Sequence, residues 1–284
     1  MEQITAKTIL STVSYGKNWF GIDYNMNLYR GCSHGCIYCD SRSSCYQIDH
    51  FDTVRVKENA LVLLRNELSR KRKKGVIGIG AMSDTYNPHE KHLCMTRQAL
   101  EIILAFGFGV SIDTKSDLIV RDIDLLKAIA RTQPVIIKMT ITTIDDSLSR
   151  QIEPRVCPSS QRFAAIKKLS EAGLFVGILM NPILPWITDS EDNIRKLVAL
   201  AHQSGAKFIH TYFNVTLREN QRDYYYAQLD QLFPGLKEKY QRYYKGSYFC
   251  PIPDKQKMWR LLKQIVNVME SYIGWRISFM LTDP

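Results

Sequence analysis

The stretch NLYRGCSHGCIYCDSRSSCY, residues 27–46, contains four of the seven cysteines of the chain. Cys32, Cys36 and Cys39 follow the spacing C-x3-C-x2-C, and Cys45 stands apart. Structural zinc usually needs four ligands, so Cys45 or the histidine of this stretch would have to complete such a site. A [4Fe–4S] cluster on three thiolates leaves one iron able to bind a substrate or cofactor, whereas four cysteines are typical of electron carriers. The spacing therefore favours a catalytic metal centre, with structural zinc as the alternative.

The composition is that of a globular protein. Of the 284 residues, 45% are hydrophobic and 23% are charged, which suffices for one large domain and does not indicate disorder. No apolar run approaches the roughly 20 residues of a membrane span, and the first residues lack the features of a signal peptide. We therefore expect a cytoplasmic protein without membrane contact. There, clustered cysteines are metal ligands or catalysts more often than disulfides.

The formal net charge of +10 predicts attraction to anions, and nucleic acid is the obvious polyanion. The densest basic run covers residues 70–74. That run closes a predicted helix, where cations are favoured in any case. We therefore treat nucleic acid as a possible partner, with ordinary solvated lysines as the alternative.

Strands and helices are predicted to alternate along the chain. Strands are expected near 25–30 and over 76–81, 109–115, 134–143, 174–183 and 206–215, with helices over 58–71, 88–106, 121–132, 159–173 and 189–205. Such alternation implies a parallel sheet covered by helices. Six units fall short of the eight of a full barrel. The predicted fold class is α/β, either a partial (β/α)6 barrel of TIM type or an open doubly wound sheet.

The two faces of the predicted strands favour the barrel. Lys138 and Thr140 alternate with apolar residues in one strand, and Asp113 and Lys115 do so in another. His210 continues the pattern in a third. A parallel strand buried between two helix layers should be apolar on both faces. One polar face therefore predicts a curved sheet around a polar interior.

The pattern changes near residue 215. Residues 216–284 read as two or three helices rich in Tyr, Arg and Lys. We predict a barrel over 1–215 and a C-terminal helical extension over 216–284 that packs on the barrel.

The motif Cys32-Ser-His-Gly-Cys36-Ile-Tyr38-Cys39 resembles that of the radical S-adenosylmethionine (SAM) superfamily. With GAMSDTYNPHE, DTKS, ITTIDDSLSRQIEPR and NPILPWITDSE, the chain is similar to the spore photoproduct lyase-like, or DNA repair photolyase-like, branch over roughly residues 20–215. The resemblance implies an enzyme with one [4Fe–4S] cluster on the three cysteines and SAM at the open iron. One electron would cleave SAM and release a 5′-deoxyadenosyl radical, which abstracts hydrogen from a substrate. An electron donor such as flavodoxin or ferredoxin is implied as well.

The resemblance also implies contacts to SAM at the ends of the strands. Tyr38 would contact adenine, and a carboxylate at Asp84 suits the SAM amino group, although Asp84 could equally cap a helix. Lys115 could hold the SAM carboxylate, or it could be an ordinary edge lysine. The remaining candidates are Ser83 for the amino group, Ser116 for the carboxylate, Thr140 and Thr142 for ribose or substrate, and Asn181 near adenine.

The sequence leaves the substrate open between a nucleic-acid base lesion, a modified RNA and a peptide. The alternative from another class is a nucleic-acid-binding protein with a structural metal and no SAM chemistry. In the related lyase, a cysteine in the second-strand region returns a hydrogen atom to the product. Matching GAMSD to that region places Ala81 near the thiol's position. We therefore expect no efficient repair of spore photoproduct unless Cys157, which could face the cavity, stands in.

Overall fold

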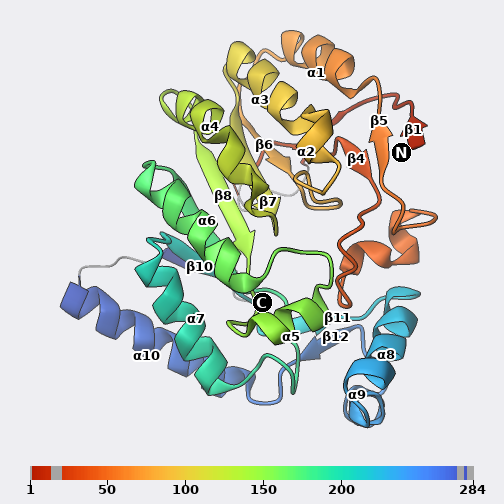
Figure 1. Ribbon diagram of the computed structural model, residues 1–284, viewed down its shortest axis with the longest axis vertical. Coiled ribbons are helices and arrows are strands. Elements are labelled where there is room, and N and C mark those ends of the chain that lie inside the picture. The colour runs from red at the N-terminus through yellow and green to blue at the C-terminus, as the bar shows by residue number, and fades with distance from the viewer. Residues whose placement is uncertain (1, 14–20, 274–277, 280–284) are drawn as a thin grey trace.

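The computed structural model describes residues 2–13, 21–273 and 278–279, and Figure 1 shows their arrangement. Within these ranges the largest sheet has eight strands in the order β13-β10-β9-β8-β7-β6-β3-β2. They are β2 (Leu10–Thr12), β3 (Tyr24–Met26), β6 (Val76–Ile79), β7 (Gly109–Thr114), β8 (Val135–Thr140), β9 (Phe175–Leu179), β10 (Phe208–His210) and β13 (Ser278–Phe279). Every neighbouring pair is parallel except β2 with β3.

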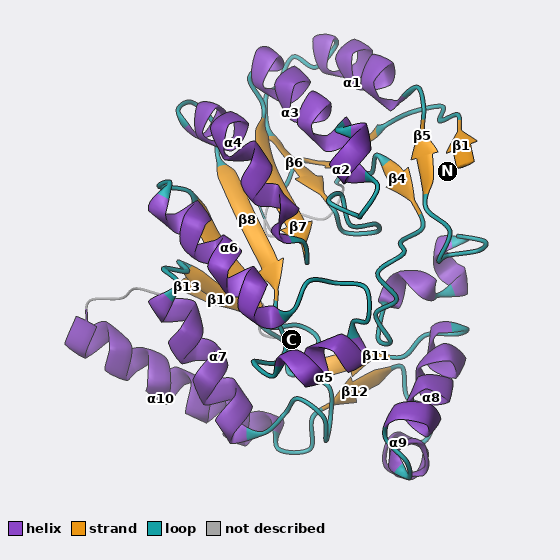
Figure 2. Ribbon diagram, viewed as in Figure 1, coloured by secondary structure: helices purple, strands orange, loops and turns teal. Residues whose placement is uncertain are grey.

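The strand order confirms the predicted fold class. From β3 to β10 the strands follow one another in the sheet in the order of the sequence, and helices connect them on the outside (Figure 2). This repetition is that of a (β/α) barrel, and the sheet ends at β2 and β13 instead of closing. The fold is therefore a partial (β/α)6 barrel of TIM type. The sequence did not predict β2 and β13, because strands of two or three residues are too short to show a period.

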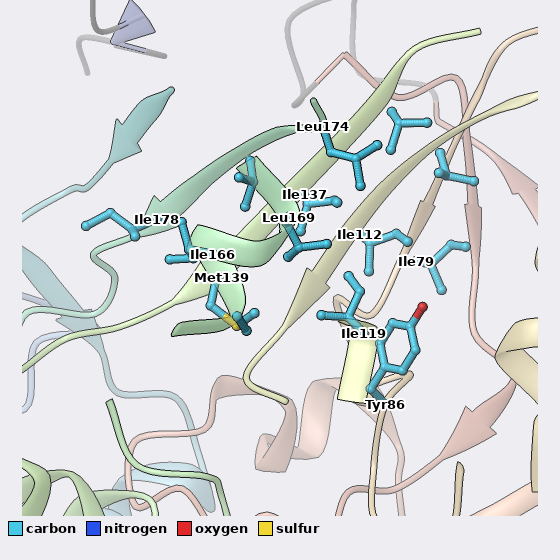
Figure 3. Close-up of a cluster of buried hydrophobic side chains, with 14 of the residues drawn as sticks. Ile79, Tyr86, Ile112, Ile119, Ile137, Met139, Ile166, Leu169, Leu174 and Ile178 are labelled. Atoms are coloured by element: carbon cyan, nitrogen blue, oxygen red, sulfur yellow. The ribbon is translucent and has the colours of Figure 1, made fainter. Parts of the chain in front are cut away.

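Helices cover the outer face of the sheet. They are α1 (Ala60–Ser69), α2 (Glu90–Leu93), α3 (Met95–Phe106), the 3-10 helix η3 (Asp117–Asp122), α4 (Ile123–Ala130), α5 (Asp146–Ile152), α6 (Ser159–Glu171) and α7 (Glu191–Gln203). The apolar face of the strands packs under them, and Figure 3 shows Ile112 and Ile137 gathered with Ile166 and Leu169 of α6. No helix of the described residues is long and apolar enough to cross a membrane.

The prediction of a single helix over 88–106 is wrong, because two helices, α2 and α3, cover this range. Cys94, expected inside that helix, has a left-handed backbone (φ 52°) and separates α2 from α3. A left-handed residue cannot continue a right-handed helix. The buried Glu90 stabilises the break, because its Oε2 accepts a hydrogen bond from the backbone N–H of Thr96 at 3.0 Å, in the first turn of α3.

The other face of the strands forms the polar interior that the sequence predicts. Asp113 of β7 is the register partner of Lys138 of β8, and the Lys138 Nζ lies 2.8 Å from the Asp113 Oδ1. Lys138 is 2% exposed, so its charge is enclosed within the protein. Gly78 of β6 is the register partner of Ser111, and Gly177 of β9 is the register partner of Lys138, so neither glycine adds a side chain beside these residues.

The cysteine loop, residues 31–54, projects from the barrel. A small sheet of β1 (Glu2–Ile4), β5 (Arg55–Lys57) and β4 (Tyr29–Arg30) closes its base, because β4 and β5 pair in antiparallel fashion on either side of the loop. Inside the loop, η1 (Asp40–Arg42) and η2 (Ser44–Tyr46) are short 3-10 turns.

The C-terminal segment packs on the cysteine loop as well as on the barrel. It contains an antiparallel pair of strands, β11 (Asn214–Thr216) and β12 (Phe249–Pro251). The helices α8 (Gln221–Leu232) and α9 (Leu236–Tyr244) lie between these strands in sequence, and α10 (Lys255–Ile273) follows them. Tyr225, Leu229 and Tyr240 form a second hydrophobic core with Ile37 and Tyr38 of the loop. α10 lies beside α7 (Figure 1). We retain the division into residues 1–215 and 216–284 as a proposal.

Candidate functional site

Cys32, Cys36 and Cys39 line one small cavity of about 80 Å³. The same cavity is lined by residues at the carboxyl ends of β6, β7 and β8, among them Lys115. All three cysteines are free thiols, and Cys32 and Cys36 are buried. Cys45 is exposed and is not among the residues that line this cavity. The fold therefore gathers three thiols at the end of the barrel where (β/α) barrels have their active sites.

Burial makes it harder for these three thiols to lose their protons. It raises the pKa of Cys32 to about 11 and raises the pKa values of Cys36 and Cys39. The Lys115 cation opposes this effect at Cys36 and Cys39. Thiolate ligands at this position therefore need a cationic partner beyond Lys115, and iron ions are such a partner. The donor set fits a cluster that is held by three cysteines.

Lys115 directs a positive charge at the cavity. Burial alone would lower its pKa, but Cys36, Glu153 and Cys39 raise the pKa of Lys115 to about 12. Its Nζ lies 5.7 Å from the ring centroid of Tyr38. Within the described ranges, Lys115 forms no ion pair. The ammonium group is thus charged at neutral pH and remains available to an anionic ligand, as the assignment to the SAM carboxylate requires.

Asp84 connects the cysteine loop to the barrel. Its Oδ1 accepts hydrogen bonds from the Tyr86 backbone N–H (2.9 Å) and the Thr114 hydroxyl (2.8 Å). Its Oδ2 accepts from the Lys115 backbone N–H at 2.8 Å and lies 3.1 Å from Nε2 of His34. Burial alone would raise the pKa of Asp84, but these partners, above all His34, lower it to about 2. The carboxylate therefore has structural contacts on both oxygens, and binding of the SAM amino group by Asp84 stays a prediction.

The two predicted serines lie in different places. Ser83 lines the cysteine cavity, and its hydroxyl donates to the carbonyl of Gly31 at the start of the loop. Gly31 has a positive φ of 79°, and a Cβ there would lie 2.4 Å from the carbonyl oxygen of Thr53, so glycine is required. Ser116 instead accepts from the Leu118 backbone N–H and is not among the residues that line the cysteine cavity.

Tyr38 is anchored below the cavity by a buried network. Its hydroxyl donates to Glu153, and Glu153 pairs with the fully buried Arg162. Arg162 also donates to the backbone carbonyls of Thr140 and Cys157, each at 2.8 Å. Glu153 and Arg162 therefore form a buried ion pair that fixes the Tyr38 hydroxyl.

Arg155 lies outside the network of Tyr38, Glu153 and Arg162. Its Nη1 donates to the backbone carbonyl of Ser33 at 3.1 Å, and its backbone N–H donates to the carbonyl of His34 at 3.1 Å. Arg155 therefore holds the cysteine loop from the other side.

Thr140 lines the cysteine cavity, but Thr142 and Asn181 do not appear among its lining residues. Thr142 Oγ1 and Asn181 Oδ1 are buried and have no hydrogen-bond partner in the described part of the chain. Both keep an unused acceptor, so ligand contact by these two residues stays a prediction.

His34 and Asp113 also line the cysteine cavity. The sequence places them in the cysteine stretch and, with Lys115, on the polar face of one strand. Sequence reasoning missed Gln221, which reaches the loop from α8. Gln221 had no local signal, since its partner, the Tyr38 carbonyl, is far away in sequence.

Comparison with known proteins agrees with this geometry. The family model of the Radical SAM superfamily matches residues 26–201. An uncharacterised protein of Mycobacterium tuberculosis (strain H37Rv) is 31% identical over 244 residues, which are 84% of this chain and 71% of the relative. One of Methanocaldococcus jannaschii is 36% identical over 174 residues, 60% of this chain and 64% of the relative.

Among solved structures, a spore photoproduct lyase variant with bound AdoMet and dinucleoside spore photoproduct has a similar fold. The TM-score is 0.70 at 14% sequence identity, and the match covers 99% of this chain and 81% of the lyase. At this identity the match shows the shared fold and leaves the reaction open.

Proposed function

Because the chain belongs to the radical SAM superfamily, whose enzymes use a [4Fe–4S] cluster and SAM, we propose that Cys32, Cys36 and Cys39 hold this cluster. The observation that supports the proposal is that three free thiols share one cavity while Cys45 lies outside it. A cluster bound there supplies the electron that cleaves SAM to a 5′-deoxyadenosyl radical for hydrogen abstraction. The alternative of a structural metal without SAM chemistry disagrees with the family match.

The chain's own contribution is to place SAM. Lys115 would hold the SAM carboxylate, because it lines the cavity and forms no ion pair in the described residues. Tyr38 would present its backbone and ring to adenine from within the loop. The other proposed contacts are Ser83 and Asp84 for the amino group, Ser116 beside Lys115, Thr140 and Thr142 for ribose or substrate, and Asn181 near adenine.

We keep nucleic acid as the proposed substrate class. The net charge of +10 supports it, and so does the shared fold with a lyase that was solved with a dinucleoside. Binding of a labelled oligonucleotide should weaken steeply as salt rises, because phosphate contacts release counterions. Absence of binding at low salt would turn the choice toward a peptide or small molecule. We further propose that the protein works in the cytoplasm and that a flavodoxin or ferredoxin is its electron donor.

The decisive experiment is SAM cleavage by the reconstituted protein. With SAM and dithionite under anaerobic conditions, the wild type should release 5′-deoxyadenosine even without a substrate, and Cys36→Ala should release none. Product is measured by liquid chromatography, and iron is measured on the same samples. A wild-type protein that carries its full iron content but forms no 5′-deoxyadenosine would contradict the proposal.

A further inference from the structure

A second and larger cavity lies among helices and loops of the barrel. Its volume is about 750 Å³, and it is lined by the segment that follows β6, by η3 and by α6. Small-molecule sites typically have volumes of about 300–1,000 Å³, so this cavity is large enough for a ligand of mononucleotide size. The three cysteines line the other cavity, and among the proposed SAM contacts Ser116 is the one that lines this larger cavity.

The lining of this outer cavity combines apolar walls with a cationic rim. Leu118 and Ala165 are among the apolar residues of the walls. Lys91, Arg155 and Lys168 are exposed on the rim, and none of the three forms an ion pair in the part of the chain that the structure describes.

Other charges along the outer cavity do not cancel these cations. Arg121 also lines the cavity, but its charge is already neutralised by Glu90 and Asp122. Asp117 is the one acid among the described lining residues. Three available cations around an apolar wall suit an anion that carries an apolar body.

Residues of the outer cavity contact the cysteine loop directly. His34, which is 4% exposed, lines both cavities. Arg155 bonds the loop twice, from its backbone N–H to the His34 carbonyl and from its side chain to the Ser33 carbonyl. The thiol of Cys157 donates to the backbone carbonyl of Lys115 at 3.2 Å. A ligand in this cavity therefore lies against groups that hold the loop and the predicted SAM lysine.

We propose that the outer cavity is a second ligand site that binds a phosphate ester of mononucleotide size. Binding there changes the conformation of the cysteine loop through Arg155 and His34. The cations bind the phosphate dianion, and the apolar walls accept the base or another flat apolar group. The phosphate can belong to a free nucleotide or to the end of a nucleic-acid strand. The binding part of this inference is independent of SAM cleavage.

The test is anaerobic calorimetric titration of the reconstituted holoprotein with 5′-AMP, adenosine and a 5′-phosphorylated trinucleotide. AMP should bind, and adenosine should bind more weakly because it lacks the charge. Tighter binding of AMP than of the trinucleotide supports a free nucleotide as the ligand, and the reverse supports a nucleic-acid end. No binding of AMP or the trinucleotide at millimolar concentration would overturn the site.

Two variants and one matched control locate the binding. Lys168→Glu reverses a rim charge and should weaken AMP binding roughly three- to tenfold, and Ala164→Trp should weaken it by filling the cavity. Lys167→Glu is the control, because Lys167 directly precedes Lys168 on α6 and does not line the cavity. Its Nζ lies 3.9 Å from Oε1 of Glu171. Equal loss of affinity in Lys167→Glu and Lys168→Glu would show non-specific attraction and overturn the site.

The coupling to the loop has its own readout. Saturating AMP should change the electron paramagnetic resonance spectrum of the reduced cluster in the wild type and leave that of Ala164→Trp unchanged. Binding of AMP without any spectral change would overturn the coupling. The release of 5′-deoxyadenosine, measured on the same preparations, shows separately whether SAM cleavage has failed.

Discussion

The side-chain amide of Gln221 donates a hydrogen bond to the backbone carbonyl of Tyr38 at 3.2 Å, across 183 positions of sequence. Gln221 is fully buried, and its Oε1 accepts from the Arg218 backbone N–H at 2.7 Å. The Arg218 side chain in turn lies 3.1 Å from Asp40 in the cysteine loop. The C-terminal segment therefore holds the stretch between Cys36 and Cys39 directly, in addition to packing on the barrel.

Replacing Gln221 by Ala should loosen the cluster. The change leaves buried backbone groups without a partner, which costs about 1–3 kcal/mol, and it frees the carbonyl beside the proposed ligands. We expect faster loss of iron from Gln221→Ala than from wild type, followed by absorbance in the presence of a chelator. Gln231→Ala is the control, because Gln231 is exposed on the same helix. Equal rates in both variants would show that the hydrogen bond does not protect the loop.

The exposed position of Cys45 predicts that it is no ligand. Anaerobic reconstitution should give about four irons and four sulfides per chain for wild type and for Cys45→Ala. Cys32→Ala, Cys36→Ala and Cys39→Ala should each fail to assemble the cluster. Iron and sulfide analysis decides the question, and a loss in Cys45→Ala as large as in the other three would mean a four-cysteine site.

Lys115→Met should weaken SAM binding while the cluster stays intact. Methionine keeps much of the side chain's length against Tyr38 and removes the charge, so the variant tests the charge-assisted bond alone. The expected loss is about 1.5–3 kcal/mol of binding free energy, measured by titrating SAM into the reconstituted protein. SAM affinity equal to that of wild type at full iron content would remove Lys115 from the site.

Arg162→Met should be among the more destabilising single changes in the barrel. It leaves the 1%-exposed Glu153 as an unpaired buried charge and removes the bonds to the Thr140 and Cys157 carbonyls. Breaking a buried pair in this way costs about 3–5 kcal/mol of unfolding free energy. Lys167→Ala, which breaks an exposed pair, should cost less than about 0.5 kcal/mol. Urea unfolding of the two variants measures both costs, and similar values would refute the assigned role of the buried pair.

The protein should not repair spore photoproduct efficiently, although its fold resembles the lyase. Ala81 lines the cysteine cavity and cannot donate a hydrogen atom as a thiol does. Cys157 lines the outer cavity, and its thiol donates to the Lys115 carbonyl. The reduced enzyme, given a spore-photoproduct dinucleotide and SAM, should release 5′-deoxyadenosine with little thymine. Thymine formed over many turnovers would overturn this prediction, and its loss in Cys157→Ala would identify a relocated donor.

The hydrophobic pattern alternates along the chain between the period of strands and the period of helices, and this alternation was sufficient to predict the barrel. Strands such as β7 and β8 have six residues each, long enough to show a polar and an apolar face. The pairing of β11 with β12 was missed, because three-residue strands are defined by partners far away in sequence. The break at Cys94 was missed for a similar reason, since the buried Glu90 that stabilises it lies in the preceding turn and reads locally as a good helix former.

Sequence reasoning found the cysteines because their spacing is local. It also expected Lys115 near them, because Lys115 directly follows a strand and therefore lies at the carboxyl edge of the sheet. The contact of Asp84 with His34 could not be predicted, because it depends on how the cysteine loop folds back over the barrel.

The hydrogen bond from Gln221 to Tyr38 also sets the order of events during biosynthesis. The ribosome releases the three thiols long before it releases Gln221, because 183 positions separate the two ends of this contact. The segment that encloses the cysteine loop is therefore made well after the thiols that it covers. A chain that stopped before α8 would keep the three cysteines and lose the Gln221 hydrogen bond that holds their loop.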